Sequence, residues 1–399
     1  MAALLAAAVV GLLAGYGLKA QCLNPRVWNG FEFRHSCYSD IVPLYAGRNL
    51  NARHFPYIDS TAATRANRTD VEYPVGTGLY MGDVALTVTT VNSFFNANAV
   101  GLAIMGLLTT LCLARMAADR RRVLLFALGP ALVLYAFHNW DLLAVGPMAV
   151  ALYAYWRGRE GWAGFALGIA AATKLFPAFI LPALLLASWK RSRQAPWALA
   201  GTFVAGAAIL NIPVMMANFP GWKYPWDFQS ARTANFETSW FMLSRRLGPE
   251  HQKWFFDSSF VNLLSGALFV VGAGVLLAIE AMRKRARPYA TSFALLLWFL
   301  VTAKVFSPQY MLWVLPFFAL LSMPWWSYVA FAVTDAAVWF AVSGYFLGGS
   351  ANHRLWILEI TVWARYAVLL MLIVLSHYVA ELVVDPGSEV QAAPVPLTA

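Results

Sequence analysis

The sequence predicts an all-α protein, a polytopic transmembrane bundle of about ten to twelve membrane helices, some of them short or broken. Composition carries this prediction. Of the 399 residues, 60% are hydrophobic and only 12% are charged, and the mean hydropathy is +0.59, well above that of a soluble domain. We expect one membrane domain over residues 1–383 and a flexible cytoplasmic tail over 384–399.

The first element is an apolar segment from Met1 to Leu18 that lacks a basic start. Lys19 follows it without a clear cleavage site, so we expect a retained membrane span rather than a signal peptide. Further helices are expected where apolar stretches recur, at 80–114, 122–139, 141–156, 162–173, 175–188, 197–216, 259–280, 289–303, 305–322, 326–346 and 355–379. The 80–114 stretch is too long for one straight span, and its first half is expected at the membrane interface.

Basic residues predict the orientation of the bundle. Thirteen of them lie in four short turns, 115–122, 157–159, 190–193 and 283–287. Short loops rich in Arg and Lys face the cytoplasm, so both termini are expected inside and the protein is expected in the plasma membrane.

Two long polar loops, 20–74 and 218–258, then face outward. This assignment requires 162–188 to be a hairpin of two half-spans that turns between Thr173 and Pro177. One continuous helix would instead place the 190–193 turn outside.

Several classes of partner are not expected. The net charge of +10 is explained by the cytoplasmic turns, so nucleic acid is not expected as a partner. The chain has no Walker loop and no Gly-x-Ser-x-Gly, and its six His and three Cys show no metal-ligand spacing. We therefore expect no cofactor and no metal, and we expect a monomer.

Polar residues gather at the expected outer ends of the helices. They are Asp40, Glu72, His138, Asn139, Trp140, Asp141, Lys174, Trp226, Asp227, Arg232, Lys304, Ser307, Gln309, Tyr310, His353 and Arg354. Ionisable groups at a membrane edge usually face a cavity, which makes this side the candidate site. The alternative for each residue alone is a snorkelling side chain or a helix cap.

Two lysines lie inside apolar runs beside helix-breaking prolines, Lys174 in Thr-Lys-Leu-Phe-Pro and Lys304 in Lys-Val-Phe-Ser-Pro-Gln-Tyr. A proline leaves backbone hydrogen-bonding groups without a partner in the helix. At membrane depth such groups are tolerated only beside a cavity or neighbouring protein. A cation there suits a phosphate, and snorkelling remains the alternative.

Asp40 is the strongest candidate for chemistry because it lies in the first long loop, beside the membrane surface. A carboxylate at the water interface with cations nearby suits a general base that activates a hydroxyl while the cations hold an anionic leaving group. A single base serves an inverting glycosyl transfer. Asp59, Asp70 and Glu72 compete for this role. Cys22 and Cys37 fall in the same loop, where an oxidising compartment favours a disulfide, although the two could also be unrelated small residues.

A resemblance supports this chemistry. The order of Tyr38-Ser39-Asp40, Glu72-Tyr73-Pro74, Thr173 to Pro177 and Ser307 to Trp313 resembles the type C glycosyltransferases, in particular family 87, over roughly residues 20–320. These enzymes are inverting, polyprenol-phosphate-mannose-dependent mannosyltransferases with a base in an early outer loop, a role that the resemblance gives to Asp40.

The resemblance also implies a lipid-phosphate sugar donor and a glycan or glycolipid acceptor at the bilayer. By position it puts Lys174, Lys304 and Gln309 near the donor phosphate, and Tyr73 and Trp140 near sugar or lipid. We further expect Arg232 at the phosphate and Glu72, His138, Tyr310 and His353 around the sugar or the acceptor.

Two other functional hypotheses stay open. A transporter or flippase for lipid-linked sugars would share many spans and broken helices. A membrane scaffold would explain the spans but not the polar residues. The transferred sugar is expected to be mannose, with a pentose possible in the same architecture.

Overall fold

The computed structural model describes residues 1–24, 28–247, 249–348 and 355–385, with the side chains of 249–252 left aside. Within these residues the elements are helices, and the only strand-like features are two isolated bridges, Ala117 with Val383 and Leu321 with Glu381. The predicted all-α class is confirmed.

Six helices of the described chain are long and apolar enough to cross a membrane. They are α1 (Ala2–Ala20), α6 (Val91–Met116), α12 (Ala195–Ala217), α16 (Ser258–Met282), α19 (Trp325–Leu347) and α20 (Leu355–Ser376). The chain is therefore an integral multi-pass membrane protein. The apolar surfaces of α12 and α16 are mostly exposed, which fits contact with lipid.

Shorter helices fill the interior of the bundle. Nearly all of α9 (Leu142–Trp156) and α17 (Pro288–Thr302) is buried, and both are too short to span on their own. Their all-round apolar surfaces are those of core helices surrounded by protein.

The 162–188 stretch folds as the predicted hairpin. Helix α10 (Glu160–Thr173) ends at Lys174, and the chain returns through η4 (Phe176–Ile180) and α11 (Leu181–Arg191). The Arg191 guanidinium bonds to Glu160, so the two ends of the hairpin meet.

Three expected helices are broken in the structure. The 80–114 helix is divided into α5 (Val75–Thr87) and α6, with Thr90 capping the second. The expected 122–139 helix was wrong as one element, since it divides into α7 (Val123–Ala127) and α8 (Pro130–Tyr135). A Cβ on Gly129 would lie 2.3 Å from the Leu125 carbonyl oxygen, so the close approach needs glycine, and Pro130 then starts a new helix.

The expected 305–322 helix was also wrong as one element. It divides into η5 (Pro308–Trp313) and α18 (Phe317–Leu320). Pro308 and Pro316 explain the division, because each lacks the N–H that a continuous helix would use.

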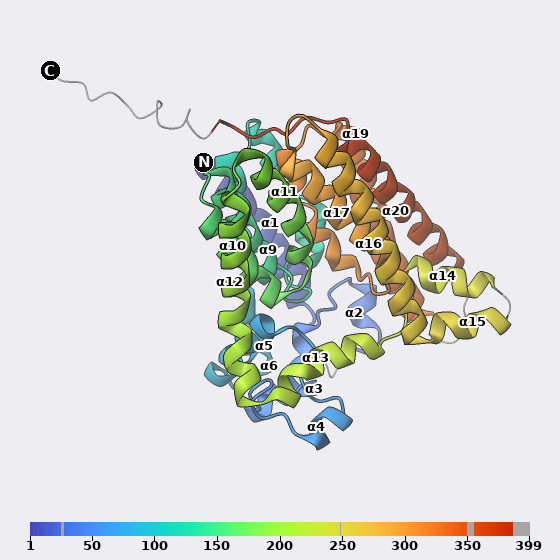
Figure 1. Ribbon diagram of the computed structural model, residues 1–399. Helices are drawn as coiled ribbons and strands as arrows, with labels where there is room; N and C mark the ends of the chain where they lie inside the picture. The colour runs from blue at the N-terminus through green and yellow to red at the C-terminus, as the bar shows by residue number, and fades with distance from the viewer. Residues whose placement is uncertain (25–27, 248, 349–354, 386–399) are drawn as a thin grey trace.

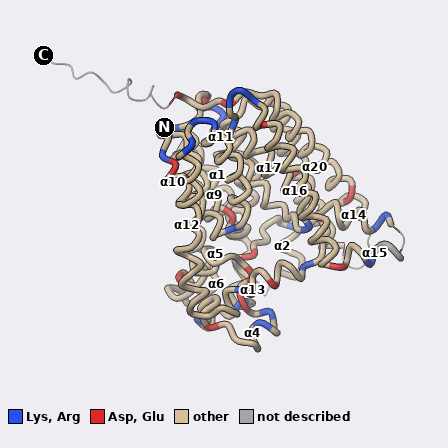
Figure 2. Tube along the Cα trace, viewed as in Figure 1, with Lys and Arg blue, Asp and Glu red and all other residues tan. Residues whose placement is uncertain are grey.

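The basic turns gather at one end of the bundle, together with the amino terminus (Figures 1 and 2). There η3 (Arg120–Arg122) joins α7, and Arg122 donates to the carbonyl oxygens of Leu321 and Met323 at 2.9 and 2.7 Å. The Val384 N–H donates to Met116 O at 2.9 Å, which brings the last described residues to the same end. Residues 386–399 of the expected tail lie outside the described residues.

The two long loops lie toward the opposite end (Figure 1). The first forms α2 (Phe31–Arg34), α3 (Ile41–Gly47), η2 (Leu50–Ala52) and α4 (Ala62–Ala66). The second forms α13 (Phe219–Ala231), α14 (Ser239–Arg246) and α15 (Pro249–Phe256). Helix α13 lies between the ends of α12 and α16 that are far from the amino terminus, and it contacts both helices (Figure 1).

Candidate functional site

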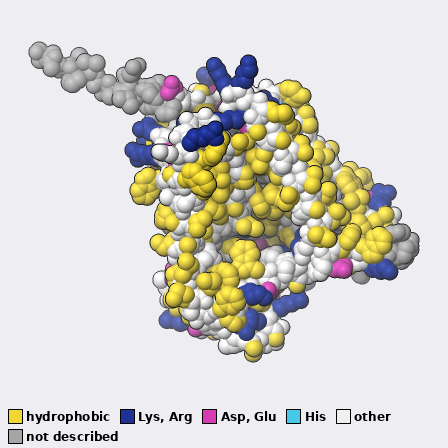
Figure 3. All heavy atoms as spheres, in the orientation of Figure 1, with side chains coloured by type: hydrophobic (Ala, Val, Ile, Leu, Met, Phe, Trp, Pro, Cys, Tyr) yellow, Lys and Arg dark blue, Asp and Glu magenta, His cyan; other side chains and the backbone are white. Residues whose placement is uncertain are grey.

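A cavity of about 760 Å³ lies between the two long loops and the ends of the membrane helices. Its mouth is the hollow between the α12 and α16 sides of the face shown in Figure 3. Of the eleven residues that were given a specific role at the site, eight line it, namely Asp40, Glu72, Tyr73, Lys174, Arg232, Lys304, Gln309 and Tyr310. Four separate segments of the sequence thus meet in one place.

Backbone contacts to the turn after α8 fix the position of Asp40. The Asp40 N–H donates to His138 O at 2.7 Å, and Ser39 Oγ donates to Phe137 O at 2.7 Å. A disulfide between Cys22 and Cys37 closes the loop just before this segment. Asp40 therefore belongs to a loop that is tied to the helical bundle on two sides.

The environment of Asp40 suits proton transfer. Its side chain keeps access to the cavity but is otherwise surrounded by protein, and this burial raises the pKa of Asp40 to about 6. The Tyr38 hydroxyl, which donates to Oδ1 at 2.9 Å, and the charge of Lys174 act in the opposite direction on that pKa. The carboxylate is then ionised at neutral pH and still able to take up a proton there.

Glu72 is held by Arg48, a residue that was not among those expected at the site. Arg48 donates through Nε to Oε2 at 2.6 Å and through a terminal nitrogen to Oε1 at 2.9 Å, a bidentate pair. Such a fork fixes both carboxylate oxygens. Glu72 is therefore oriented at the cavity wall, and its charge is offset.

Lys304 and Arg232 place positive charge on the cavity without an acidic partner in the described chain. The Lys304 ammonium instead binds the carbonyl oxygens of Arg232 and Ser230, at 2.6 and 3.2 Å, where α13 ends. Gln309 is 4% exposed, and its Oε1 has no hydrogen-bond partner among the described residues. The two cations make this wall suited to an anion, whereas the Gln309 oxygen can only accept a hydrogen bond.

Lys174 differs from Lys304, because its charge is already paired. Its Nζ lies 2.5 Å from Oδ1 of Asp141, and the Trp313 indole N–H donates to the same oxygen at 2.6 Å. Asp141 is fully buried, while Lys174 still lines the cavity.

Two of the expected residues that the structure describes, His138 and Trp140, do not line the cavity. His138 packs behind Tyr38, with 5.5 Å between the ring centroids, and Trp140 is fully buried with its indole N–H on Asn98 Oδ1 at 2.6 Å. Both side chains support the walls instead. His353 lies outside the described residues, as does Arg354.

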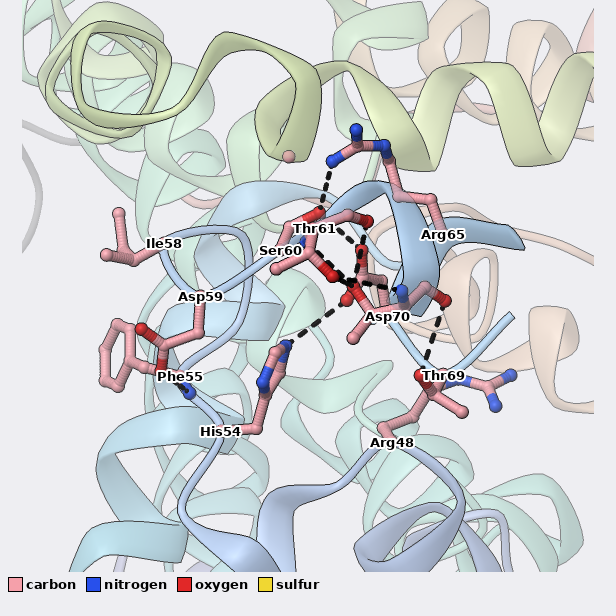
Figure 4. Close-up of polar contacts among 12 residues, drawn as sticks. Arg48, His54, Phe55, Ile58, Asp59, Ser60, Thr61, Arg65, Thr69 and Asp70 are labelled. Atoms are coloured by element: carbon pink, nitrogen blue, oxygen red, sulfur yellow. Dashed lines mark hydrogen bonds and ion pairs between the residues drawn. The ribbon is translucent and has the colours of Figure 1, made fainter. Parts of the chain in front are cut away.

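The competing carboxylates of the first loop, Asp59 and Asp70, are engaged within that loop (Figure 4). Asp59 Oδ2 accepts from the Phe55 N–H at 2.7 Å. Asp70 accepts from Ser60 Oγ at 2.5 Å and contacts His54 Nε2 at 3.3 Å. Neither lines the cavity, so they stabilise the loop that carries Glu72.

Within the described residues, no group of three or more His, Cys, Asp and Glu side chains is arranged to hold a metal ion.

Fold and site together define a multi-pass membrane protein whose cavity combines the carboxylates of Asp40 and Glu72 with two cations, Arg232 and Lys304, that have no acidic partner among the described residues. The model of glycosyltransferase family 87 matches residues 84–308, more than half of the chain. The chain belongs to glycosyltransferase family 87, and membership implies a membrane glycosyltransferase. Comparison with curated proteins gives no match. The matched region contains Lys174, Arg232 and Lys304, whereas Asp40 and Glu72 precede it.

Proposed function

We propose that the protein is an inverting glycosyltransferase that moves a mannosyl residue from a polyprenyl-phosphate donor to a glycan or glycolipid acceptor. The main support is that Asp40, whose pKa is raised to about 6, shares one cavity with two cations that have no acidic partner among the described residues. A base and an anion site in one cavity are what this transfer needs.

In the reaction, the acceptor hydroxyl loses its proton to the Asp40 carboxylate as its oxygen attacks the anomeric carbon. The bond from that carbon to the phosphate oxygen breaks, and the polyprenyl phosphate leaves with the bonding electrons. Lys304 and Arg232 stabilise the negative charge of the leaving phosphate, assisted by the Gln309 amide. Attack opposite the leaving group inverts the configuration.

Glu72 has a different role from Asp40. Its oxygens are held by Arg48, which favours accepting hydrogen bonds from acceptor or sugar hydroxyls over taking a proton. Tyr73 and Tyr310 add flat aromatic faces to the same cavity, and such faces pack against sugar rings.

Helix α16 gives the donor lipid a path to the bilayer. Asn262, Ser265 and Gly266 line the cavity, while Leu263 and Val270 on the same helix are exposed. The phosphate and sugar enter the cavity, and the polyprenyl chain stays against the outer surface of α16.

The charge pattern favours an outward-facing site. The basic turns lie at the end opposite the two loops, so the positive-inside rule puts the cavity on the extracytoplasmic face of the plasma membrane and both termini in the cytoplasm.

The test uses purified protein in sealed lipid vesicles with radiolabelled polyprenyl-phosphate mannose and a lipid extract as the acceptor source. The expected result is labelled product of inverted anomeric configuration. Asp227→Asn is the matched control for the Asp40→Asn variant, because Asp227 is exposed in a surface pair with Lys223. Transfer from a nucleotide sugar and not from the lipid donor, or movement of the lipid donor across the bilayer without product, would contradict the proposal.

A further inference from the structure

A buried ion pair forms part of the cavity wall. Asp141 immediately precedes α9 and Lys174 immediately follows α10, so two residues 33 positions apart, at the ends of consecutive helices, supply the two charges. The Asp141 side chain is 0% exposed and the Lys174 residue 8% exposed. The pair therefore lies at the boundary between the protein interior and the cavity.

Aromatic rings hold the Lys174 ammonium on the other sides. Its Nζ lies 5.6 Å from the ring centroid of Tyr73, 5.5 Å from that of Tyr310 and 5.9 Å from that of Trp313. All three rings line the cavity. This arrangement, with Asp141 behind it, keeps the ammonium in place and makes it a poor ligand for a mobile phosphate.

Fold stability alone does not account for the pair. Burying two charges removes hydration that their attraction repays only in part, and an apolar pair of similar volume is often at least as stable. In addition, Asp141 Oδ2 is buried with no hydrogen-bond partner in the described structure. A buried group left unsatisfied beside a reaction cavity points to a role in the chemistry.

We propose that Asp141 and Lys174 are positioning residues, a fixed pair of opposite charges that sets the electrostatic field at the Asp40 carboxylate. Lys174 stabilises the ionised form of Asp40 and Asp141 opposes it, so the pair keeps the carboxylate near the balance between its two forms. The cavity wall can then carry a lysine beside the base without making the base too weak.

Other charged and titratable groups also act on Asp40, and they stay in place in the variants below. They are Tyr38 and Glu72 from the same loop, Lys19 from α1, Glu237 before α14, and the hydroxyls of Tyr73 and Tyr310. The effects of Asp141 and Lys174 are therefore measured as differences against this constant background.

The experiment titrates the Asp40 carboxyl directly, without donor or acceptor. Infrared spectra are recorded against pH for each variant, and the spectrum of the same variant carrying Asp40→Asn is subtracted. Lys174→Met should raise the midpoint of Asp40 by about 0.5 to 1 pH unit, and Asp141→Asn should lower it by a similar amount. Lys223→Met, an exposed control, should leave the midpoint unchanged.

The double variant Asp141→Asn, Lys174→Met removes both charges and leaves no lone buried ion, so it guards against misfolding of either single variant. Its midpoint should return to within about 0.3 pH unit of wild type. The proposal would be overturned if the Asp40 midpoint shifted in the same direction in both single variants, or if it shifted in neither. A midpoint in the double variant that differs from wild type by more than about 0.3 pH unit would also overturn it.

The importance of the pair for turnover rests on the proposed function. In each variant, the low-pH limb of the pH–rate profile for transfer should shift by the same amount as the titration midpoint of Asp40. Transfer that survives Asp40→Asn would refute the proposed base. If transfer needs Asp40 but the pH–rate profile does not shift in Lys174→Met or Asp141→Asn, the positioning role would be refuted.

Discussion

The Tyr38 hydroxyl donates a 2.9 Å hydrogen bond to Oδ1 of Asp40, two residues along the same loop. Three rings pack around Tyr38, those of Trp28, Phe33 and His138, with centroid separations of 5.3, 5.6 and 5.5 Å. The charge of Asp40 raises the pKa of Tyr38, so the phenol keeps its proton and remains a donor. This hydrogen bond holds the carboxylate in one orientation, and Oδ2 is the oxygen that the proposed mechanism would use.

Tyr38→Phe tests this hydrogen bond. The bond lowers the pKa of Asp40, so its loss should raise that pKa above about 6 and move the low-pH limb of activity upward by about 0.5 to 1 pH unit. Activity should fall most below pH 7 and recover in part at higher pH. The pH profile of the transfer rate measures this.

Tyr45→Phe is the matched control for that variant. Tyr45 is a buried tyrosine of the same loop that stacks on Phe94, with no bond to Asp40. An unmoved limb in Tyr38→Phe, or an equal movement in Tyr45→Phe, would contradict the role of the hydrogen bond.

Lys304→Ala tests the anion site. Loss of a charge-assisted contact to the donor phosphate should raise the KM for the lipid donor by about 10- to 100-fold and leave the KM for the acceptor nearly unchanged. Initial rates over a range of donor concentrations measure the KM for the lipid donor.

Lys304 also holds the end of α13, so the thermal unfolding midpoint of the variant must be recorded beside its kinetics. Lys223→Ala, on the exposed side of α13, is the control for loss of a positive charge. A donor KM equal to that of wild type in Lys304→Ala would remove Lys304 from the phosphate site.

Asp40→Asn should also stabilise the protein at neutral pH. The pKa of Asp40 is raised from 3.8 to about 6 in the folded protein, so the folded state binds more protons than the unfolded state between these values. Its ionised form therefore destabilises the fold above pH 6, by about 1 kcal/mol after allowance for partial exposure. The gain in unfolding temperature should be present at pH 7.5 and vanish near pH 4. A gain that is independent of pH would contradict this origin.

The orientation of the bundle is open to labelling with a membrane-impermeant maleimide. Cys22 and Cys37 are joined in a disulfide and Cys112 is buried, so none of the native cysteines competes for the label. Ala63→Cys in the first long loop should react in intact cells, and Arg193→Cys in the basic turn only after permeabilisation. Labelling of the Arg193→Cys variant in intact cells would show that the orientation is the reverse of the one proposed.

Composition and local sequence rules predicted much of the fold. Hydropathy indicated the membrane helices, and a proline after Lys174 together with the basic 190–193 turn predicted the α10–α11 hairpin. These features depend on neighbouring residues, which is why one sequence is enough to predict them. The breaks at Gly129 and Pro316 were missed, because in a uniformly apolar stretch the hydropathy pattern does not change where a helix stops.

The candidate site was predictable as a set of residues but not as a network. The partners Arg48 and Glu72 are 24 residues apart and Asp141 and Lys174 are 33 apart, and only tertiary packing brings them together. For that reason the sequence alone did not separate the paired Lys174 from Lys304, which has no acidic partner in the described chain.

The most direct measurement of the central claim is the rate of transfer by Asp40→Asn with the lipid-phosphate donor saturating. Loss of the base should lower the rate about 100- to 10,000-fold, while the dissociation constant of the donor stays within about threefold of wild type, because Lys304 and Arg232 remain in place. Transfer at the wild-type rate by a correctly folded Asp40→Asn protein would show that Asp40 is not the base.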